Sequence, residues 1–371
     1  MVNIENKADC TGCHSCMTVC PRRCITMASD KQGFKYPIVN ADDCINCKLC
    51  DKVCHMKRDD LRSKPYKAYA AKNNNENERM SSSSGGIFVA VAKWVIGKGG
   101  SVYGAAFDEK FRVHHVRVTK EEDLEQLQTS KYVQSDIENT YIQAIADLED
   151  DKYVLFTGTP CQIGGLKSFL NKEYDKLILQ DIMCHGVPSP KLWSKYIKEL
   201  GIGEIKKICF RDKSDGWSEY HVKIEGTKKN IYDVFNKNTY MRAFIADASL
   251  RPSCYNCRYK HLDYAGDYIL ADFWGVSSIC PEMNDNKGVS LFLVNSTKGE
   301  RLFDVIKGQV EFKEVDLNSA LSKNGAAING AAMNEKNKAL FEHIDDMTVH
   351  GIVEKYIRGS LWNRVKNKLL R

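Results

Sequence analysis

The chain lacks an apolar run long enough to cross a bilayer. Its most apolar stretch, residues 87–97, is short and contains Lys93, whereas a membrane-spanning helix needs about 20 consecutive apolar residues. Residues 1–9 carry charges and no apolar stretch, so they do not resemble an export signal. We therefore expect a cytoplasmic protein without a transmembrane segment.

Two patterns typical of other function classes are also missing. No G-x-G-x-x-G sequence follows a predicted strand, so a nicotinamide site of the Rossmann type is unsupported. No stripe of basic residues alternates with aromatic residues, so we expect no nucleic-acid partner. With 371 residues, 43% of them hydrophobic, the chain is long enough for more than one globular domain.

Cysteine, in contrast, is abundant, with 15 residues. Two runs share the spacing C-x2-C-x2-C-x3-C, namely Cys10, Cys13, Cys16 and Cys20, and then Cys44, Cys47, Cys50 and Cys54. Such paired runs are the signature of a bacterial-type ferredoxin with two [4Fe-4S] clusters, in which the fourth cysteine of each run binds the other cluster. We therefore expect one cluster on Cys10, Cys13, Cys16 and Cys54, and a second on Cys44, Cys47, Cys50 and Cys20.

Zinc binding and disulfides explain these runs less well. Zinc sites usually take cysteines in two separated pairs, and disulfides need an oxidising compartment. Cys24 falls outside the spacing and is more typical of a small buried residue than of a ligand. His55, directly after the last cysteine, fits a structural role, with tuning of the nearby cluster as the alternative. Two clusters of about −2 each would offset most of the formal charge of +6.

Beyond the cysteine runs, predicted strands and helices alternate, which favours a mixed α/β domain with a substantially parallel sheet. We expect strands at 66–72, 101–107, 113–118, 153–156, 177–182, 205–210, 220–224, 231–235, 268–273 and 290–295, and helices at 87–96, 121–128, 139–148, 162–170, 191–200 and 298–306. The predicted parts are a ferredoxin-like module (1–60), a mixed-sheet α/β flavin-binding domain (65–345) and a basic helical tail (346–371). Residues 362–371 fit a solvated terminal helix, with contact to a membrane surface or a partner as the alternative.

Two loops carry residue types that suit ligand binding. Residues 81–86 (SSSSGG) open a predicted helix, and serine hydroxyls with glycine amides at a helix N-terminus suit an anion such as a pyrophosphate. A flexible linker is the alternative. Residues 157–162 (TGTPCQ) lie between a strand and a helix, where ligands bind in α/β sheets. A tight turn explains the glycine and the proline of this loop, but not its cysteine and its threonines.

Four further cysteines are candidates for a third metal centre: Cys161, Cys184, Cys254 and Cys257. They stand on predicted loops, mostly at strand ends, and could converge on a third [4Fe-4S] cluster, which the neighbouring cluster runs favour. A zinc site or merely buried thiols are the alternatives. Cys209 and Cys280 have no partner at a useful spacing and are expected in the core.

Clusters that serve an organic substrate need a further cofactor. Each cluster passes one electron at a time, whereas most organic substrates accept two electrons as hydride. Flavins convert between these two modes. We therefore expect a flavin, with its pyrophosphate at residues 81–86.

Several motifs, in the same order, resemble the beta-subunit family of deazaflavin (coenzyme F-420) reducing hydrogenases and dehydrogenases. They are residues 83–86 (SSGG), 130–135 (SKYVQS), 157–162 (TGTPCQ), 184–186 (CHG), 251–257 (RPSCYNC) and 266–275 (GDYILADFWG). The resemblance covers the chain from residue 1 to about residue 300. It implies FAD, a third [4Fe-4S] cluster near it, and electron transfer between clusters and a hydride-accepting substrate.

The resemblance also implies roles for individual residues. The cofactor-binding candidates are Ser83, Ser84, Gly85, Gly86, Lys131, Tyr132, Thr157, Gly158 and Thr159, with Asp267 and Asp272 lining the site or bracing its loops. Cys161, Cys184, Cys254 and Cys257 would bind the third cluster. His185 is the candidate proton donor near the flavin, with a purely structural histidine as the alternative. The chain departs from the family at residues 263–265, which read Asp-Tyr-Ala where the family often has an arginine. The identity of the substrate therefore stays open.

The sequence therefore predicts an iron–sulfur flavoprotein oxidoreductase. It would pass electrons between a ferredoxin-type partner or oxidoreductase subunit and a small-molecule two-electron acceptor such as a deazaflavin. A reductase of a sugar or glycan precursor and a non-catalytic electron-transfer subunit are the two alternatives.

Overall fold

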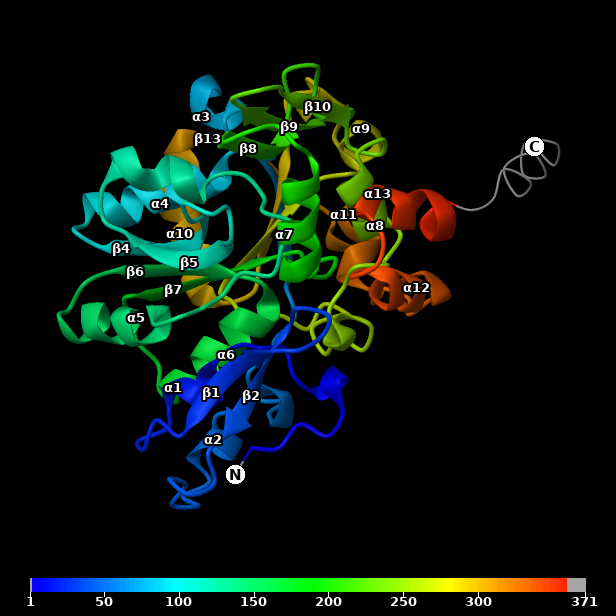
Figure 1. Cartoon of the computed structure of the whole chain (residues 1–371). Helices are drawn as coiled ribbons and strands as arrows, with labels where there is room; N and C mark the ends of the chain where they lie inside the picture. The colour runs from blue at the N-terminus through cyan, green and yellow to red at the C-terminus, as the bar shows by residue number, and fades with distance from the viewer. Residues whose placement is uncertain (1, 359–371) are drawn as a thin grey trace.

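A small cysteine-rich module lies beneath a larger α/β body, in blue at the bottom of Figure 1. The computed structural model describes residues 2–358, so the predicted terminal segment 362–371 lies outside the described residues. In the module, β1 (Ile25–Ser29) pairs antiparallel with β2 (Lys35–Val39), beside the short helices α1 (Ser15–Thr18) and α2 (Leu49–Lys52). Its own core cluster of buried residues consists of Val2, Cys24, Ile25 and Cys50. A core this small needs further cross-links, which metal clusters can supply.

The body is built on an eight-stranded mixed sheet with the strand order β13-β3-β12-β11-β7-β6-β4-β5. The strands are β3 (Lys67–Asn73), β4 (Ser101–Phe107), β5 (Val113–Val118), β6 (Val154–Gly158), β7 (Leu177–Ile182), β11 (Tyr268–Asp272), β12 (Ser290–Val294) and β13 (Val310–Val315). The central strands β4, β6, β7 and β11 run parallel, and the outer strands pair antiparallel. The predicted mixed α/β fold is thus confirmed.

Helices cover both faces of this sheet because its strands are apolar on both sides. The helices are α3 (Glu76–Met80), α4 (Ile87–Gly97), α5 (Thr140–Glu149), α6 (Pro160–Leu170), α9 (Val276–Ile279), α10 (Thr297–Ile306) and α11 (Leu317–Leu321). Along β12, Phe292 packs with α4 and α10, whereas Leu291 and Leu293 pack with α9 and α11 on the opposite face. Helices α5 and α6 cover Tyr103 and Phe156 on that same opposite face. The parallel strands are therefore buried on both sides, as parallel sheets usually are.

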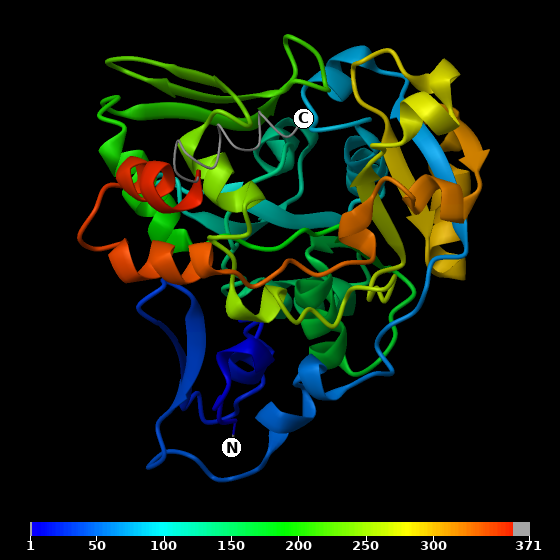
Figure 2. The same cartoon turned by 90° about the vertical axis from the view of Figure 1, so that its right-hand side faces the viewer.

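A second, smaller sheet stands above the carboxyl side of the main one and has its own core. It consists of β8 (Ile205–Asp212), β9 (His221–Gly226) and β10 (Ile231–Val234), all antiparallel. Around it lie α7 (Pro190–Glu199), α8 (Thr239–Ile245), α12 (Glu335–His343), α13 (Val349–Ile352) and a π-helical turn, Val353–Ile357. Figure 2 shows the three strands at the upper left, with α12 and α13 below them. Val349, Ile352, Val353 and Ile357 are buried in this core, so the packed chain continues past residue 345, where the sequence analysis ended the second domain.

Most expected elements are present, and the differences have local causes. Residues 101–107, 113–118 and 177–182 form strands with the predicted bounds. Residues 121–127 form a 3-10 helix instead of an α-helix. The edge strand β13 was not predicted, because its residues are mostly exposed and carry no alternating apolar pattern. None of the helices between residues 2 and 358 combines the length and the hydropathy that a bilayer crossing requires.

Arg251 joins the cysteine-rich module to the body. Its side chain is completely buried, and its guanidinium donates to the carbonyl oxygens of Cys10 (2.8 Å) and Lys35 (2.9 Å) and to Oε1 of Gln134 (3.0 Å). The guanidinium also lies over the ring of Tyr36, 4.3 Å from its centroid. One side chain therefore satisfies acceptors on both parts of the protein.

We predict that Arg251→Met loosens this junction. The substitution leaves three buried acceptors without a donor, and each unsatisfied group costs about 1–3 kcal/mol. Amide hydrogen exchange should become faster at residues 10–13 and 34–36. The control is Arg112→Met, because Arg112 is exposed and pairs only with the nearby Asp108. Equal exchange in the two variants would contradict the role assigned to Arg251.

Candidate functional site

The eight cysteines of the two N-terminal runs line two separate cavities. One cavity is lined by Cys10, Cys13, Cys16 and Cys54, and the other by Cys20, Cys44, Cys47 and Cys50. The fourth cysteine of each run thus lies with the first three of the other run. We call the first set the inner cysteine site, since it adjoins the body, and the second set the outer cysteine site.

The inner site packs directly against helix α6. Ser15 Oγ donates to the carbonyl oxygen of Gly165 (2.8 Å), and a Cβ added at Gly165 would come within 2.7 Å of Cβ of Cys13. Only glycine allows this approach. Burial alone would raise the pKa of Cys13, but the neighbouring His55 and a bond with Ser15 outweigh it and bring the pKa to about 6.

The outer site lies further from the body and is more open to solvent. Cys47 is exposed. Cys24 is buried, as expected, and its Sγ lies 3.4 Å from Sγ of Cys20. Cys24 therefore packs beside the candidate ligands although it falls outside their spacing.

The four dispersed cysteines also meet at one cavity, which we call the third cysteine site. Cys161 lies in the first turn of α6, Cys184 follows β7, Cys254 ends a 3-10 turn (Pro252–Cys254), and Cys257 follows shortly after that turn. Thr159 Oγ1 lies 3.2 Å from Sγ of Cys161, and the backbone N–H of Val187 donates to Sγ of Cys254 (3.4 Å). The tertiary structure thus collects thiols from three segments of the chain.

The thiols of this third site do not converge on a single ion. Among residues 2–358, no three His, Cys, Asp or Glu side chains come close enough to hold one metal ion, as a zinc site requires. A four-iron cluster holds its thiolates further apart than a single ion does. Burial raises the pKa of Cys184 to about 12 and that of Cys254 to about 11, so these thiols need a cationic ligand to be thiolates at neutral pH.

The inner and third cysteine sites are neighbours. Thr11 and Met56 line both cavities. Between them lies the buried His55, whose ring nitrogens are 2.9 Å from Thr11 Oγ1 and 2.7 Å from the hydroxyl of Tyr259. Tyr259 itself lines the third site. His55 is thus part of the packing between two cysteine sites, which agrees with the structural role expected for it.

A large cavity of about 670 Å³ opens at the carboxyl ends of the parallel strands. Its lining includes Gly158 of β6, Ile182 of β7 and Asp272 of β11. It shares Thr159, Cys184, His185, Gly186 and Val187 with the third cysteine site. Its volume falls in the range of cofactor pockets, and its position is where α/β sheets bind ligands.

The Ser-Gly loop forms one wall of this cavity and is well anchored. Ser83, Ser84 and Gly86 line the cavity, and Ser84 Oγ donates to the carbonyl oxygen of Val289 (2.9 Å). Gly86 adopts a left-handed conformation with φ of 79° and immediately precedes α4, which has no side-chain cap. These anchors exclude the flexible-linker interpretation. Gly85 does not line the cavity, since its backbone packs against Ala71 and Ser290.

Lys131 and Tyr132 form another part of the wall. The ammonium of Lys131 donates to the carbonyl oxygens of Gln126 and Gln128, both at 2.7 Å. Burial lowers the pKa of Lys131 to about 7. Burial raises the pKa of Tyr132, whose ring packs against Phe210 and Phe244.

The end of β6 and the turn after it present Thr157, Gly158 and Thr159 to the cavity and are held on both sides. Thr159 caps α6 in a reciprocal capping box with Gln162. His115 donates from Nε2 to the carbonyl oxygen of Thr157 (2.9 Å) and lies 2.7 Å from Ser135 Oγ. Burial lowers the pKa of His115 to about 4, so the imidazole is neutral at physiological pH. The turn therefore has a fixed shape before any ligand binds.

Asp272 lies in the cavity beside a buried arginine. Its Oδ2 is 3.0 Å from Nη2 of Arg211, and the Arg211 guanidinium stacks 3.8 Å from the ring centroid of Tyr220. Nε of Arg211 has no hydrogen-bond partner within the described residues. Arg211 thus has one buried donor without a partner, while the residue lines the cavity.

His185 lines both the large cavity and the third cysteine site. Its Nε2 lies 2.6 Å from Oδ1 of Asp247, and its ring packs edge-on against Phe244. The carboxylate fixes the ring orientation, in the way that carboxylates orient histidines in catalytic pairs.

Asp267 lies away from the cavity, and this corrects its assignment as a cofactor-binding residue. It precedes β11, whereas the cavity opens at the other end of that strand. Its carboxylate accepts hydrogen bonds from the backbone N–H of Leu179 (2.9 Å) and from Ser296 Oγ (2.7 Å). Asp267 therefore braces the sheet. In the departing segment 263–265, Tyr264 and Ala265 are buried in the core and do not line the cavity.

Sequence reasoning did not single out two residues of the cavity, His115 and Arg211. His115 comes from the edge strand β5 and Arg211 from β8 of the second sheet. Neither belongs to a recognisable local motif. Arg211 stands near the end of β8, whereas His115 lies in the middle of β5 beside a second histidine, His114.

Two regions of the chain match known protein families. Residues 151–318 match the family described as coenzyme F420 hydrogenase/dehydrogenase, C terminus of the beta subunit. Residues 9–57 match the family "4Fe-4S dicluster domain". The first match contains the third cysteine site and the turn after β6, and the second contains the inner and outer cysteine sites.

A curated relative and a solved structure are similar to this chain. The relative is a coenzyme F420-dependent sulfite reductase from Methanocaldococcus jannaschii, 26% identical over 326 residues, which are 84% of this chain and 47% of the relative. The chain thus spans about half the length of that relative. The solved structure is an F420-reducing [NiFe] hydrogenase complex from Methanosarcina barkeri, at 15% identity and a TM-score of 0.47, covering 80% of this chain and 94% of the other. Residues 9–57 thus match a 4Fe-4S dicluster domain, and residues 151–318 match the C-terminal domain of the beta subunit of coenzyme F420 hydrogenases and dehydrogenases.

Proposed function

We propose that this oxidoreductase passes electrons between a one-electron partner protein and a two-electron acceptor of the deazaflavin class. The observation that supports the proposal is that three sites adjoin one another, each sharing lining residues with the next. The inner cysteine site shares Thr11 and Met56 with the third cysteine site, which in turn shares Cys184 and His185 with the large cavity. All fifteen cysteines lie outside disulfide bonds, which fits a reducing cytoplasm.

The cysteine residues would hold three [4Fe-4S] clusters. Cys10, Cys13, Cys16 and Cys54 would bind one, Cys20, Cys44, Cys47 and Cys50 another, and Cys161, Cys184, Cys254 and Cys257 the third. The last set suits a cluster because its half-buried thiols line one cavity without meeting at one point. Thr159 and the N–H of Val187 would then donate to the cysteine sulfurs, as donors around clusters commonly do.

The large cavity fits FAD. Its size suits a cofactor, and the N-terminus of α4, which lacks a side-chain cap, can bind a pyrophosphate beside Ser83 and Ser84. Lys131 and Arg211 would add positive charge to the same cavity. When bound, a flavin supplies the conversion between one- and two-electron transfer.

His185 would hold the proton that accompanies hydride chemistry. It lines both sites, and Asp247 fixes its ring. The deazaflavin acceptor rests on the family that residues 151–318 match and on the curated relative, which is twice as long as the matched region. The partner would be an electron-transfer protein or another oxidoreductase subunit.

We predict about twelve iron atoms and one FAD per chain after anaerobic purification. Cys184→Ser and Cys254→Ser should each lower the iron content to about eight, because a cubane rarely survives the loss of a thiolate. Cys209→Ser is the matched control, since Cys209 lines none of the three cysteine sites. An unmodified chain with about eight iron atoms and no flavin would favour the non-catalytic electron-transfer subunit.

We predict that His185→Gln slows reduction of a deazaflavin by about 100-fold, which is within the range for losing a general acid. Reduction of the protein by dithionite and its iron and flavin contents should not change. His114→Gln is the control, because His114 lies on β5 outside the cavity. If His185→Gln retains full deazaflavin turnover, His185 is structural. If the unmodified protein shows no turnover with a deazaflavin, the sugar-reductase alternative gains support.

We predict that FAD binding weakens as the pH rises above about 7. Burial lowers the pKa of Lys131 to about 7 in the free protein, and an anionic pyrophosphate nearby raises it again. Above pH 7, FAD binding therefore requires Lys131 to take up a proton. The affinity for FAD accordingly falls from pH 7 towards pH 9. Isothermal titration of the apoprotein with FAD measures this slope. In Lys131→Met the slope should disappear, and an unchanged slope would exclude Lys131 as its cause.

A further inference from the structure

The outer cysteine site differs from the inner site in what surrounds it. The inner site faces α6 and shares lining residues with the third cysteine site. The outer site shares none, and its Cys47 is exposed. If electrons reach the body through the inner site, the outer site is the end of the series that faces solution.

The surface around the outer site carries unpaired positive charge. Arg22 and Lys48 line the outer cavity, Arg23 follows Arg22, and Lys52 ends the short helix α2 that follows Lys48; all four are exposed. Among residues 2–358, no carboxylate lies within ion-pair distance of any of these four cations. The exposed carboxylates in the same stretch are Asp42 and Asp43, so the surface side chains carry an excess of cations, and a cluster of about −2 would lie beneath them.

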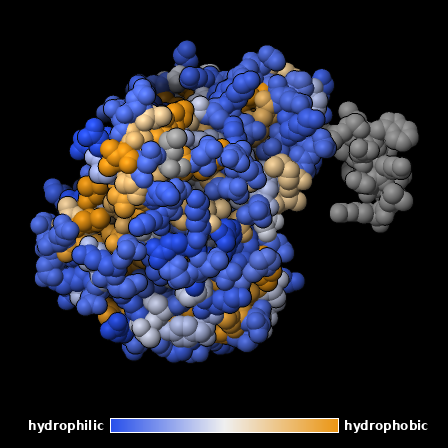
Figure 3. Space-filling model, turned by 90° about the horizontal axis from the view of Figure 1, so that it is seen from below, coloured by the Kyte–Doolittle hydropathy of each residue, from blue (hydrophilic) through white to orange (hydrophobic). Residues whose placement is uncertain are grey.

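A large apolar side chain lies among these charges. Ile45 is 61% exposed and also lines the outer cavity. Figure 3 looks onto the molecule from the side of this module and shows a mainly hydrophilic surface interrupted by separate hydrophobic patches. An exposed apolar side chain ringed by charge is typical of a docking surface for a transient partner.

We propose that this surface, formed by Arg22, Ile45, Lys48 and Lys52, docks an acidic one-electron carrier protein, and that the outer cysteine site is where electrons enter or leave. The inference rests on the proposed function. In each encounter the reduced carrier loses one electron and the outer cluster gains it, with no bond made and no proton moved. Excess positive charge accelerates encounter with an acidic carrier by electrostatic steering.

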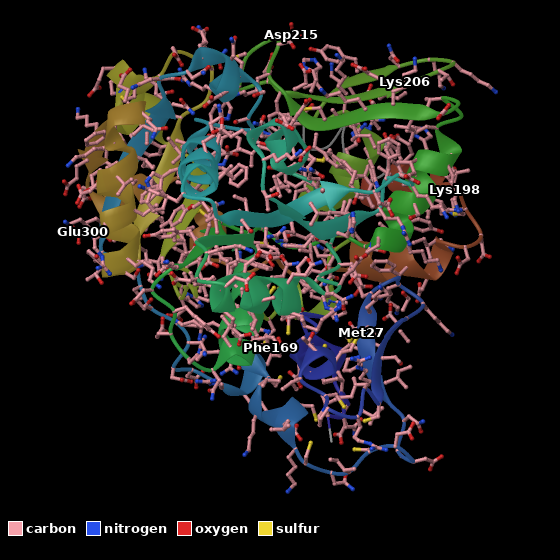
Figure 4. The ribbon with its side chains drawn as sticks, turned by 90° about the vertical axis from the view of Figure 1, so that its left-hand side faces the viewer. Met27, Phe169, Lys198, Lys206, Asp215 and Glu300 are labelled. Carbon is pink, nitrogen blue, oxygen red and sulfur yellow. The ribbon has the colours of Figure 1, made fainter. Side chains whose placement is uncertain are left out.

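The test uses the full-length holoprotein with Arg22→Glu and Lys52→Glu combined. Arg23 and Lys48 are left unchanged because both adopt the left-handed conformation. The matched control combines Lys198→Glu and Lys206→Glu, which changes the charge equally. Figure 4 places both control lysines on the body, far from Met27 of the module, and neither has an ion pair among the described residues.

The readout is the rate at which the visible absorbance of the clusters bleaches on mixing with a reduced acidic ferredoxin. At about 0.01 M ionic strength, where screening is weak, the Arg22/Lys52 variant should react about tenfold more slowly than the control. At about 1 M salt the difference should vanish. With reduced methyl viologen, a small cation, the same variant should react faster than the control. Equal ferredoxin rates in the two variants at low salt would overturn the proposal.

A second variant tests the apolar part of the surface. Ile45→Gln should raise the ferredoxin concentration needed for half-maximal bleaching rate, at low and at high salt alike. Ile142→Gln is its control, because Ile142 is similarly exposed on α5. An equal effect of both substitutions would remove Ile45 from the docking surface. Cluster bleaching needs neither FAD nor a hydride acceptor, so a failed flavin assay and a failed docking assay are distinguishable.

Discussion

The buried guanidinium of Arg251 is the contact on which the arrangement of the redox sites depends. It donates to the backbone of the module at Cys10 and Lys35, and it immediately precedes the segment that carries Cys254. Burying a charged group costs free energy unless it has partners. Here carbonyl oxygens and an amide oxygen accept the hydrogen bonds of the guanidinium, and the ring of Tyr36 lies against its face. Arg251 therefore holds the two cysteine systems next to each other, together with the bonds from Ser15 to Gly165 and between His55 and Tyr259.

Parallel strand pairing provides the second half of the arrangement. Because β6, β7 and β11 run in the same direction, their carboxyl ends open at one edge of the sheet, where Thr157, Cys184 and Asp272 meet the large cavity. The third cysteine site is lined by residues of the same loops. A cluster and a cofactor placed there would lie in contact with shared residues, so that electron transfer between them would need no conformational change.

The cysteine runs could be interpreted from the sequence because their spacing is a local property. Ligands separated by two or three residues converge through local backbone geometry. Because the pattern is repeated, few other interpretations of the cysteine runs remain. The cavity wall was only partly predictable. Ser83 and Thr157 belong to loops whose composition signals a turn, whereas His115 and Arg211 come from strands that carry no such signal. Whether Asp267 lines the cavity depends on the end of β11 at which the cavity opens. A sequence motif does not contain that information.

The sequence by itself determined the ferredoxin-like module, the mixed α/β class of the body and the identity of the candidate cysteines. These follow from spacing and from hydrophobic periodicity, which act over a few residues. Only the tertiary structure decided that Cys161, Cys184, Cys254 and Cys257 meet, that the inner site adjoins them, and that the outer site faces solution among unpaired cations. Such contacts join residues about 20 to 240 positions apart, and they form because burial of the sheet faces and of Arg251 selects one packing of the whole chain.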